Sequence, residues 1–299
     1  MRNEKKQPES EAVSIQWFPG HMTRTKRQME KYIKQVDAVA ELVDARVPVS
    51  SRNPVLHKLI QGKPRVILMT KSDMADPVAT KGWLEYYRSQ GIPAIALDCR
   101  SGKGISGFIP LVREVLWDRI AAWEKKGMVG RTIRVMVVGI PNVGKSSLIN
   151  RLCKGGKANV EDRPGVTREN RWFAIGKGFD LLDTPGVLWP KFEDKLVGEH
   201  LAFTGAVRDE VVDTEHLASR LLELLAALYP EALRQRYRLE GGLEQYRGDQ
   251  LLEQIGKNRG MLMAGGVVNT ERASIAVLDE FRSAKLGRIT LEKAPARPQ

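Results

Sequence analysis

One segment of the sequence has the residue types and spacing of a loop that binds phosphate. Residues 139–146 read G-I-P-N-V-G-K-S and match the pattern G-x-x-x-x-G-K-[ST]. The apolar run before them predicts a strand and the residues after them a helix, so backbone N–H groups and a helix N-terminus would converge on the phosphates. We expect Lys145 to bridge the terminal phosphates and the Ser146 hydroxyl to bind Mg²⁺. The residues of this segment expected to contact the nucleotide are Asn142, Val143, Gly144, Lys145, Ser146 and Ser147.

The sequence after this loop contains residues that would complete a magnesium and γ-phosphate site. Asp183 begins the run D-T-P-G at the end of an apolar stretch, and we expect it to hold Mg²⁺ through water. The N–H of Gly186 is expected to contact the γ-phosphate. Thr167 lies between the two motifs, where a switch loop ordered by the γ-phosphate belongs, and it is the expected second Mg²⁺ ligand. We expect Lys145 and Thr167 to take part in catalysis, although Thr167 could instead only cap a helix or a turn.

A third motif has the chemistry to read a guanine base. Residues 70–73 read T-K-S-D and resemble the guanine-specificity motif N-K-x-D. The Asp73 carboxylate can accept hydrogen bonds from guanine N1–H and N2–H₂, a pair of donors that adenine lacks, so ATP should be rejected. The Lys71 stem would lie along the base plane. Thr70 replaces the usual Asn, and we expect one polar contact to the base or the phosphate loop to be lost. The expected base-binding residues of this motif are Thr70, Lys71, Ser72 and Asp73.

A second loop is expected to touch the base. Residues 98–104 read D-C-R-S-G-K-G where a guanine-binding protein would have S-A-K-x-G-x-G. Cys99 takes the place of the alanine, whose main contribution is a backbone N–H to guanine O6 that any residue except proline supplies. We therefore expect Asp98 and Cys99 to belong to the base site, with a weaker affinity than the usual residues give. The alternative for the T-K-S-D motif is an ordinary turn at the end of a strand.

The order of these motifs predicts an unusual topology. In a Ras-like domain the base-reading motif follows the phosphate loop and the D-T-P-G segment, whereas here residues 70–73 precede both. The order therefore indicates a circularly permuted GTPase.

The residue that would activate water is not obvious from the sequence. Val187 follows Gly186 where a Ras-like enzyme has a water-orienting Gln, and valine cannot hydrogen-bond a water molecule. His21 is our candidate, because an imidazole can orient a water or accept its proton near neutral pH. The competing interpretation is that His21 packs beside Trp17. Asn142 has a second expected role, since an asparagine at this place helps bind K⁺ in GTPases that use a monovalent cation; it could also only stabilise the turn.

Composition limits the class of partner. The 299 residues carry a net charge of +12 and a sequence pI near 9.7, which favours a polyanionic partner. Cys99 and Cys153 are the only cysteines, too few for a disulfide framework, and no apolar run approaches the ~20 residues that cross a bilayer. We therefore expect a cytoplasmic protein that binds RNA and no membrane. The sequence is silent on dimerisation, and a monomer is the default expectation.

Apolar runs that alternate with helical patterns predict a doubly wound α/β domain with a mostly parallel sheet. Past residue 207 only helical patterns remain. We expect a disordered polar leader at 1–14, the GTPase domain at 15–206 and a helical domain that binds RNA or the ribosome at 207–299. The expected strands are Ala38–Val43, Arg65–Met69, Ala94–Leu97, Ile133–Val138, Trp172–Ile175 and Asp180–Leu182. The expected helices lie near 79–90, 106–125, 145–153, 194–205, 217–228, 249–264 and 270–285.

Together these motifs resemble the circularly permuted GTPases of ribosome assembly, most closely the bacterial ribosome biogenesis GTPase A family. Further segments that carry the resemblance are W-F-P-G-H-M at 17–22, D-A-R-V-P at 44–48 and L-A-F-T-G at 201–205. The resemblance implies a Ras-like fold with a helical C-terminal domain, GTP, GDP and Mg²⁺ as ligands, and binding to the immature large ribosomal subunit and its rRNA in late assembly. It also implies turnover stimulated by the particle, with His21 as the catalytic histidine.

Two alternatives to an assembly GTPase stay open at this point. One is an RNA-binding scaffold that holds GTP with negligible turnover, and the other is an ATP-using remodelling factor, which requires that Asp73 does not read the base. If the helical domain binds RNA, its basic residues would contact phosphates; the alternative is that they form a solvated helical surface. These residues are Arg234, Arg236, Arg238, Lys257, Arg259, Arg272, Arg282, Lys285 and Arg288.

Overall fold

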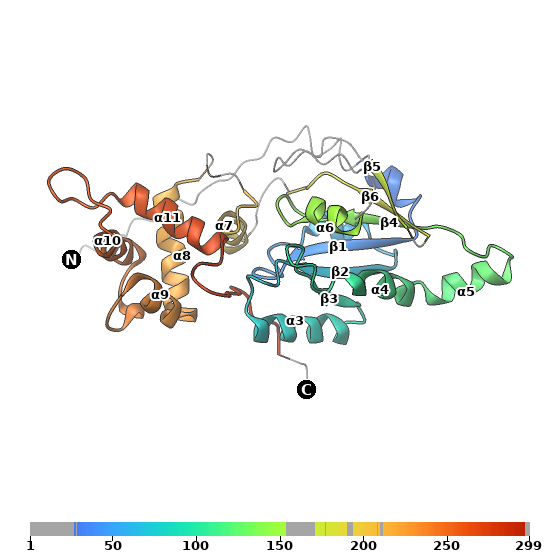
Figure 1. The fold of residues 1–299 in the computed structure, drawn as a ribbon, viewed down its shortest axis with the longest axis horizontal. Helices are drawn as coiled ribbons and strands as arrows, with labels where there is room; N and C mark the ends of the chain where they lie inside the picture. Colours follow the sequence, from blue (N-terminus) through green and yellow to red (C-terminus); the bar gives the residue numbers. More distant parts are fainter. Residues whose placement is uncertain are drawn as a thin grey trace, which may run out of the picture.

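Six strands form one sheet in this computed structural model, which describes residues 27, 29–153, 171–176, 178–189, 194–207, 209 and 212–296. The leader expected at 1–14, His21 and Thr167 lie outside the described residues. The strand order is β3-β2-β1-β4-β6-β5, and all neighbours are parallel except β5, which runs antiparallel to β6 at one edge (Figure 1). All six strands confirm the sequence-based predictions: β1 (Ala38–Asp44), β2 (Arg65–Thr70), β3 (Ala94–Ala96), β4 (Ile133–Val138), β5 (Arg171–Gly176) and β6 (Phe179–Asp183).

Helices cover both faces of the sheet. Every residue of β1 is buried, as expected for a central parallel strand whose two faces are both packed. Leu42 and its neighbours at alternate positions pack with α4 (Phe108–Val115) and α6 (Lys145–Leu152). Residues of the opposite face pack against α2 (Pro54–Leu59) and α3 (Pro77–Ser89). The sheet is therefore the middle layer of a doubly wound α/β unit, in agreement with the predicted fold class.

The helix expected near 106–125 is interrupted. A short 3₁₀ turn at Ile105–Gly107 leads into α4, and Leu116 separates α4 from α5 (Trp117–Lys125). No residue of α5 is fully buried, and the helix extends away from the sheet in Figure 1. The Trp117 side chain at its start is 72% exposed. The segment between α4 and β4 thus projects into solvent before the chain re-enters the sheet as β4.

The second half of the chain folds around one central helix. α8 (Thr214–Leu228) contacts α7 (Lys195–Phe203), α9 (Pro230–Tyr237), α10 (Gly248–Asn258) and α11 (Thr270–Arg282). Its buried leucines recur at helical spacing, as the sequence predicted. Pro230 does not merely break α8: it starts α9, since proline suits the first turn of a helix.

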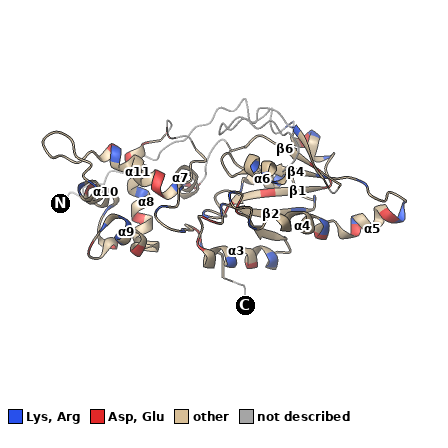
Figure 2. Cartoon of the chain, viewed as in Figure 1, with Lys and Arg blue, Asp and Glu red and all other residues tan. Residues whose placement is uncertain are grey.

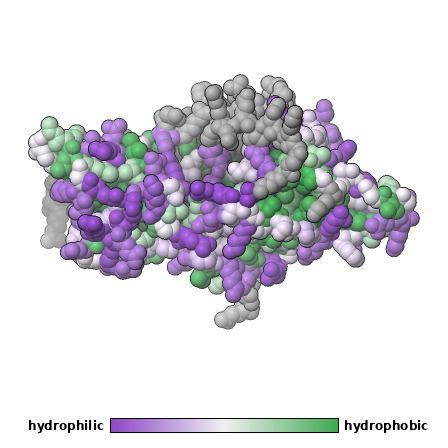
Figure 3. Space-filling model, in the orientation of Figure 1, coloured by the Kyte–Doolittle hydropathy of each residue, from purple (hydrophilic) through white to green (hydrophobic). Residues whose placement is uncertain are grey.

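The helix predicted at 249–264 is too long. α10 ends at Asn258, and the chain then forms a hairpin in which Met263 N donates to Val267 O at 2.8 Å. Three glycines with positive φ, Gly260, Gly265 and Gly266, permit these turns and oppose a continuous helix. The hairpin projects from the molecule and is apolar at its tip (Figure 3), where Leu262, Met263 and Val267 are about half exposed or more.

The last described segment is not helical, in contrast to the all-helical domain expected at 207–299. After α11 the chain returns to the sheet: Ile289 N donates to Met74 O at 3.0 Å, and Leu291 N donates to Arg46 O at 2.8 Å. One buried apolar cluster also runs without a break from the sheet to the helices around α8. The two halves are therefore packed together over a shared core. No helix in the described ranges is long and apolar enough to cross a bilayer.

Candidate functional site

The predicted phosphate loop joins β4 to α6, as its mechanism requires. Asn142 and Gly144 have positive φ angles of 57° and 101°, so the loop curls tightly before α6 begins at Lys145. Ser146 and Ser147 lie exposed in the first turn of α6. Their hydroxyl groups and the N-terminal N–H groups of α6 are thus accessible to an anion and its metal ion.

Lys145 is folded back onto the loop that carries it. Its Nζ donates to Ile140 O at 2.8 Å and to Gly139 O at 3.2 Å, and only 7% of the residue is exposed. Burial lowers the pKa of Lys145 to about 8, although Asp183 acts in the opposite direction. A bound phosphate would offer Nζ a full negative charge in place of two carbonyl dipoles.

The D-T-P-G segment lies directly against the phosphate loop. Asp183 ends β6 and is buried, and the Thr184 hydroxyl donates to Val137 O at 2.7 Å. A Cβ added to Gly186 would lie 2.7 Å from Pro141 Cα and 3.0 Å from Lys145 Nζ. Only glycine permits this approach, so the Gly186 backbone is next to the expected position of the terminal phosphate.

Thr70 keeps a contact that we expected this substitution to remove. Its Oγ1 lies 2.6 Å from Val143 O in the phosphate loop and 3.1 Å from Val43 O of β1. A hydroxyl has one hydrogen to donate, and the shorter distance favours Val143. The base-reading motif is therefore bonded to the phosphate loop although the residue is not Asn.

Lys71 is held by an ion pair with a buried carboxylate. Its Nζ lies 3.1 Å from Asp44 Oδ2, and Asp44 also accepts two hydrogen bonds from the Arg46 guanidinium, at 2.9 Å and 2.7 Å. Burial acts to raise the pKa of Asp44, but the charges of Arg46 and Lys71 outweigh it and hold this pKa well below its usual range. Burial lowers the pKa of Lys71, and Asp44 opposes this change. Arg46 in turn lies over the ring of Phe281 in α11.

The second base loop is organised by Asp98. Its carboxylate accepts hydrogen bonds from Arg100 N at 2.7 Å and Ser101 N at 3.2 Å, and also from the Ser101 hydroxyl. Asp98 thus shapes its own loop, a role that a serine at this position could fill less completely. Burial, together with nearby Asp98 and Asp73, raises the pKa of the Cys99 thiol to about 11, so this thiol stays protonated at neutral pH.

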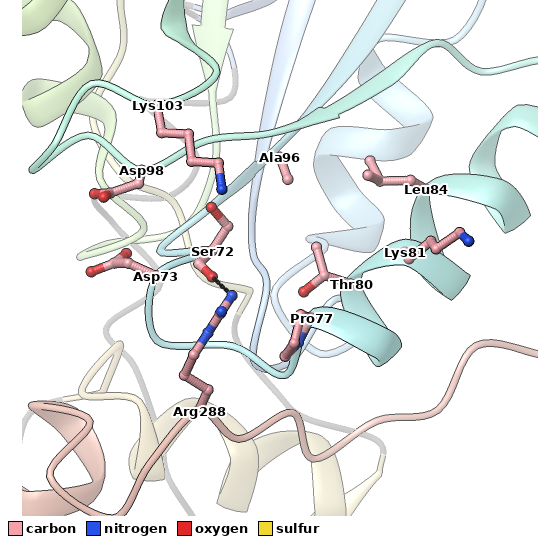
Figure 4. A pocket seen from close by; sticks show the side chains of 10 residues that line it. All are labelled: Ser72, Asp73, Pro77, Thr80, Lys81, Leu84, Ala96, Asp98, Lys103 and Arg288. Carbon is pink, nitrogen blue, oxygen red and sulfur yellow. Dashed lines mark hydrogen bonds between the residues drawn. The ribbon is translucent and has the colours of Figure 1, made fainter.

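A cavity of about 430 Å³ opens beside the base-reading loop (Figure 4). The carboxylates of Asp73 and Asp98 point to the same side of it, away from Leu84 and Lys81 of α3. Arg288 reaches it from the C-terminal segment. The lining residues are Ser72, Asp73, Pro77, Thr80, Lys81, Leu84, Ala96, Asp98, Lys103 and Arg288.

Val187 occupies the position of the usual water-orienting Gln. It is 8% exposed and packs in an apolar cluster with Leu182 and Leu56, and its carbonyl accepts a hydrogen bond from Asn53 Nδ2 at 2.7 Å. Its side chain can therefore exclude water but cannot bind it. His21 and Thr167, two of the three predicted catalytic residues, lie outside the described residues.

Asn142 points toward α7. Its Nδ2 donates to Gly205 O at 2.6 Å, just past the C-terminus of α7, so the amide is oriented by a contact between the phosphate loop and the second half of the chain. The other amide atom, Oδ1, has the chemistry of a cation ligand. Within the described part of the chain no group of three or more His, Cys, Asp or Glu could hold a metal ion.

Sequence reasoning gave no role to several residues that hold these loops. In the sequence, Asp44 and Arg46 contribute only to the resemblance of D-A-R-V-P, and the expected role of Arg288 is a contact with RNA. A buried Asp beside Arg in an apolar strand is a signal for an ion pair, but its partner Lys71 lies 27 residues away and only the sheet brings the two together.

Comparisons with known proteins agree with this geometry. A family model described as 50S ribosome-binding GTPase matches residues 134–233. The Ribosome biogenesis GTPase A of Bacillus licheniformis is 45% identical over 93% of this chain and 98% of its own length. The protein of the same name from Priestia megaterium is 46% identical over 94% and 97%. The solved GDP-bound structure of TM YlqF has a TM-score of 0.62 and 25% identity, and the match covers 89% of this chain and 99% of that one.

Proposed function

This chain belongs to the ribosome biogenesis GTPase A family and is a GTP-hydrolysing P-loop enzyme, and we propose that it promotes late assembly of the large ribosomal subunit. In this proposal it binds the immature particle in the GTP state, and contact with the particle stimulates hydrolysis to GDP and phosphate. One observation carries the proposal. Asp44, Thr70, the phosphate loop and Asp183 stand at the carboxyl ends of four neighbouring strands, where doubly wound sheets bind ligands. The family description as 50S ribosome-binding supports the choice of particle.

We also propose that the GTPase domain is circularly permuted and spans 15–206, with a ribosome-binding domain at 207–299. The base-reading loop follows β2 and the phosphate loop follows β4, so the motif order in the chain is inverted relative to a Ras-like domain. The matched family segment 134–233 begins at β4, and the T-K-S-D motif lies before it. Both observations support the permutation.

The proposed mechanism assigns the phosphates to the loop at 139–146. Lys145 leaves its two carbonyl contacts and bridges the terminal phosphates, while N–H groups around Gly144 bind the phosphate oxygens. When bound, Mg²⁺ offsets the charge that develops on the phosphates. Exposed Ser146 and the buried Asp183 at the end of β6 have suitable oxygen donors for it, and Thr167 is the proposed third residue.

Recognition of guanine is proposed for Asp73, whose carboxylate accepts from N1–H and N2–H₂. The Lys71 stem lies along the base, and the ion pair with Asp44 fixes the position of its ammonium group. The Cys99 N–H contacts O6. Since Val187 cannot orient a water, His21 is the proposed group that does so.

The contact between Asn142 and Gly205 supports a path from the nucleotide to the helices around α8. Gly205 follows α7, and Arg282 of α11 donates to Phe203 O and Ala202 O at the same end of that helix. We propose that rearrangement of Gly186 and Asn142 on loss of the γ-phosphate moves α7 and the helices packed on it. K⁺ bound by Asn142 Oδ1 would favour the hydrolytic state.

Not all of the nine basic residues named from the sequence are suitable for contacts with rRNA. Several already have intramolecular partners, as Arg236 and Arg259 have with Glu280 and Arg282 has with Asp209. Figure 2 shows acidic residues beside basic ones elsewhere in the chain as well, for example on α3 and α5. Exposed Arg238, Arg272 and Lys285 are the better candidates for phosphate contacts. We further propose that the protein acts in the cytoplasm as a monomer.

The decisive experiment is GTP hydrolysis in K⁺ buffer with and without purified large ribosomal subunits. We expect stimulation of tenfold or more, which corresponds to about 1.4 kcal/mol off the barrier. His21→Ala should abolish the stimulation without loss of GTP binding. Stable association and tight GTP binding with no stimulation would instead favour the scaffold function and make His21 a packing residue.

A second experiment addresses the RNA contacts. Binding to the subunit should weaken steeply as salt rises, because neutralised phosphates release counterions. Replacing Arg238, Arg272 and Lys285 together by alanine should flatten that salt dependence. Binding that does not change between low and moderate salt would contradict a phosphate-contact surface.

A further inference from the structure

The C-terminal segment from Arg288 to Glu292 crosses the loops of the GTP site and is tied to them by hydrogen bonds of side chains and backbone. Thr290 Oγ1 accepts from Asp76 N and donates to Ala45 O, each at 3.1 Å. Trp83 Nε1 of α3 donates to Glu292 O at 2.9 Å. Thr290 and its neighbours Ile289 and Leu291 are buried. This segment is thus a fixed part of the sheet's ligand-binding edge, although it is more than 200 residues distant in sequence from the loops it contacts.

Arg288 begins this segment and holds the base-reading loop directly. Its Nε donates to Ala75 O at 2.9 Å and one terminal nitrogen donates to Ser72 O at 2.8 Å. The second bond is the dashed line in Figure 4. The planar guanidinium therefore bonds carbonyls on both sides of Asp73 along the chain, a two-point contact that fixes orientation as well as position.

Besides the contacts of Arg288, the described residues make three backbone hydrogen bonds at positions 72 and 74. Ser72 N donates to Leu97 O, and Met74 N donates to Lys71 O. The backbone of Lys71 is in the left-handed region, with φ of 55°. Ile289 N binds Met74 O from the same C-terminal segment. Residues 288 and 289 thus bond the carbonyls of Ser72, Met74 and Ala75, which lie before and after Asp73 in the chain.

We propose that Arg288 is a positioning residue for guanine recognition. It does not touch the base: it fixes the Ser72 and Ala75 carbonyls so that the Asp73 carboxylate meets N1–H and N2–H₂ together. This rests on the proposed base-reading role of Asp73. A bidentate contact tolerates little misplacement, so loosening the loop costs guanine more than a base that makes only one of the two bonds. Arg288 thereby takes part in nucleotide selection and not in the RNA contact expected from sequence.

The test compares GTP with inosine triphosphate, which keeps N1–H but lacks the 2-amino group. In the full-length protein without ribosomes, Arg288→Ala should weaken GTP binding about tenfold, the loss of one good charged hydrogen bond. Inosine triphosphate should lose clearly less, so the ratio of the two affinities falls. The kcat at saturating GTP should stay unchanged, because the phosphate loop is untouched, while KM rises.

Three further variants test whether the effect comes from the two-point contact of Arg288, from the loss of any exposed arginine, or from the base-reading role of Asp73. Arg288→Lys can reach one carbonyl but not both and should give an intermediate ratio. Arg88→Ala removes another exposed arginine, from the last turn of α3, and should change neither affinity. Asp73→Asn must itself lower the ratio; if it does not, the base-reading proposal for Asp73 fails and takes the role of Arg288 with it.

The outcomes that overturn the proposal are distinct from those that overturn the assembly function, which depends on ribosome stimulation. If Arg288→Ala weakens GTP and inosine triphosphate by the same factor, or lowers the melting temperature together with kcat, Arg288 only supports the fold. If Asp73→Asn lowers the ratio and Arg288→Ala leaves it at the wild-type value, the positioning role is wrong.

Discussion

The hydroxyl of Thr70 donates to the carbonyl oxygen of Val143 across 2.6 Å, and this bond joins the end of β2 to the phosphate loop after β4. These strands are not neighbours, since β1 lies between them. Thr70 Oγ1 is also 3.1 Å from Val43 O of β1, so one small side chain connects three adjacent strand ends. The base and phosphate halves of the site are therefore joined by a direct hydrogen bond.

Replacing Thr70 by valine should separate these halves. The shape is kept but the hydroxyl is lost, which leaves the buried Val143 carbonyl without this donor and should cost about 1–3 kcal/mol of stability. We expect GTP and GDP affinities to fall together, as measured with a fluorescent nucleotide. Thr70→Asn introduces the residue of the usual motif and should retain binding. Wild-type affinity in Thr70→Val would show that this bond is dispensable.

Nucleotide affinity should depend on pH through Lys145. Its pKa of about 8 without phosphate means that the ammonium is charged below pH 8 and neutral above it. Bound phosphate favours the charged form and raises this pKa, so binding above pH 8 takes up a proton. GTP affinity should therefore be flat from pH 7 to 8 and then fall by up to about tenfold per unit. Titration calorimetry in buffers of different ionisation enthalpy would detect the proton; constant affinity up to pH 9.5 would contradict the prediction.

Asp44 should stabilise the fold at neutral pH. Asp44→Asn leaves Arg46 and Lys71 without their shared buried carboxylate, and breaking such a pair costs about 3–5 kcal/mol. The pKa of Asp44 is depressed on folding, so its contribution is complete above the unfolded value near 4 and is lost as pH falls toward the lower folded value. Urea unfolding should give a constant difference between wild type and variant from pH 7 to 5 and a smaller one below pH 4.

A conservative substitution in another ion pair provides the control for this experiment. Arg52→Lys alters a different ion pair, with Glu41, whose arginine is partly exposed. It should cost less than Asp44→Asn between pH 5 and 7, where the contribution of Asp44 is complete. An equal cost would mean that the cluster of Asp44, Arg46 and Lys71 has no special weight.

Asn142 should control the response to monovalent cations. Asn142→Ala removes both the contact with Gly205 and the proposed K⁺ ligand Oδ1. We expect hydrolysis by the variant to be the same in K⁺ and Na⁺, whereas the wild type is faster in K⁺. Asn142→Asp keeps an oxygen ligand and should retain part of the stimulation. Equal wild-type rates in the two salts would exclude the K⁺ proposal, whatever the variant does.

The sequence alone determined where the strands are and which loops carry chemistry. β1, β2 and β4 are mostly apolar runs, and the motifs at 70–73, 139–146 and 183–186 are contiguous, so local information suffices to recognise them. Helix ends were less predictable. The glycines after Asn258 ended α10 early, and Leu116 divided one predicted helix into two, because these boundaries depend on turn conformations and on packing.

Only the tertiary structure decided which side chains hold the site together. Thr70 reaches Val143 because the strand order places the ends of β2 and β4 on either side of β1, at the same edge of the sheet. Lys71 meets Asp44 because β1 and β2 are paired in register. In the sequence, Arg288 is one of several basic residues near the C-terminus. In the fold, the chain returns to the sheet after α11 and places Arg288 on the base-reading loop. Such contacts join residues distant in sequence, and they depend on strand order and chain return, which no local pattern of residues encodes.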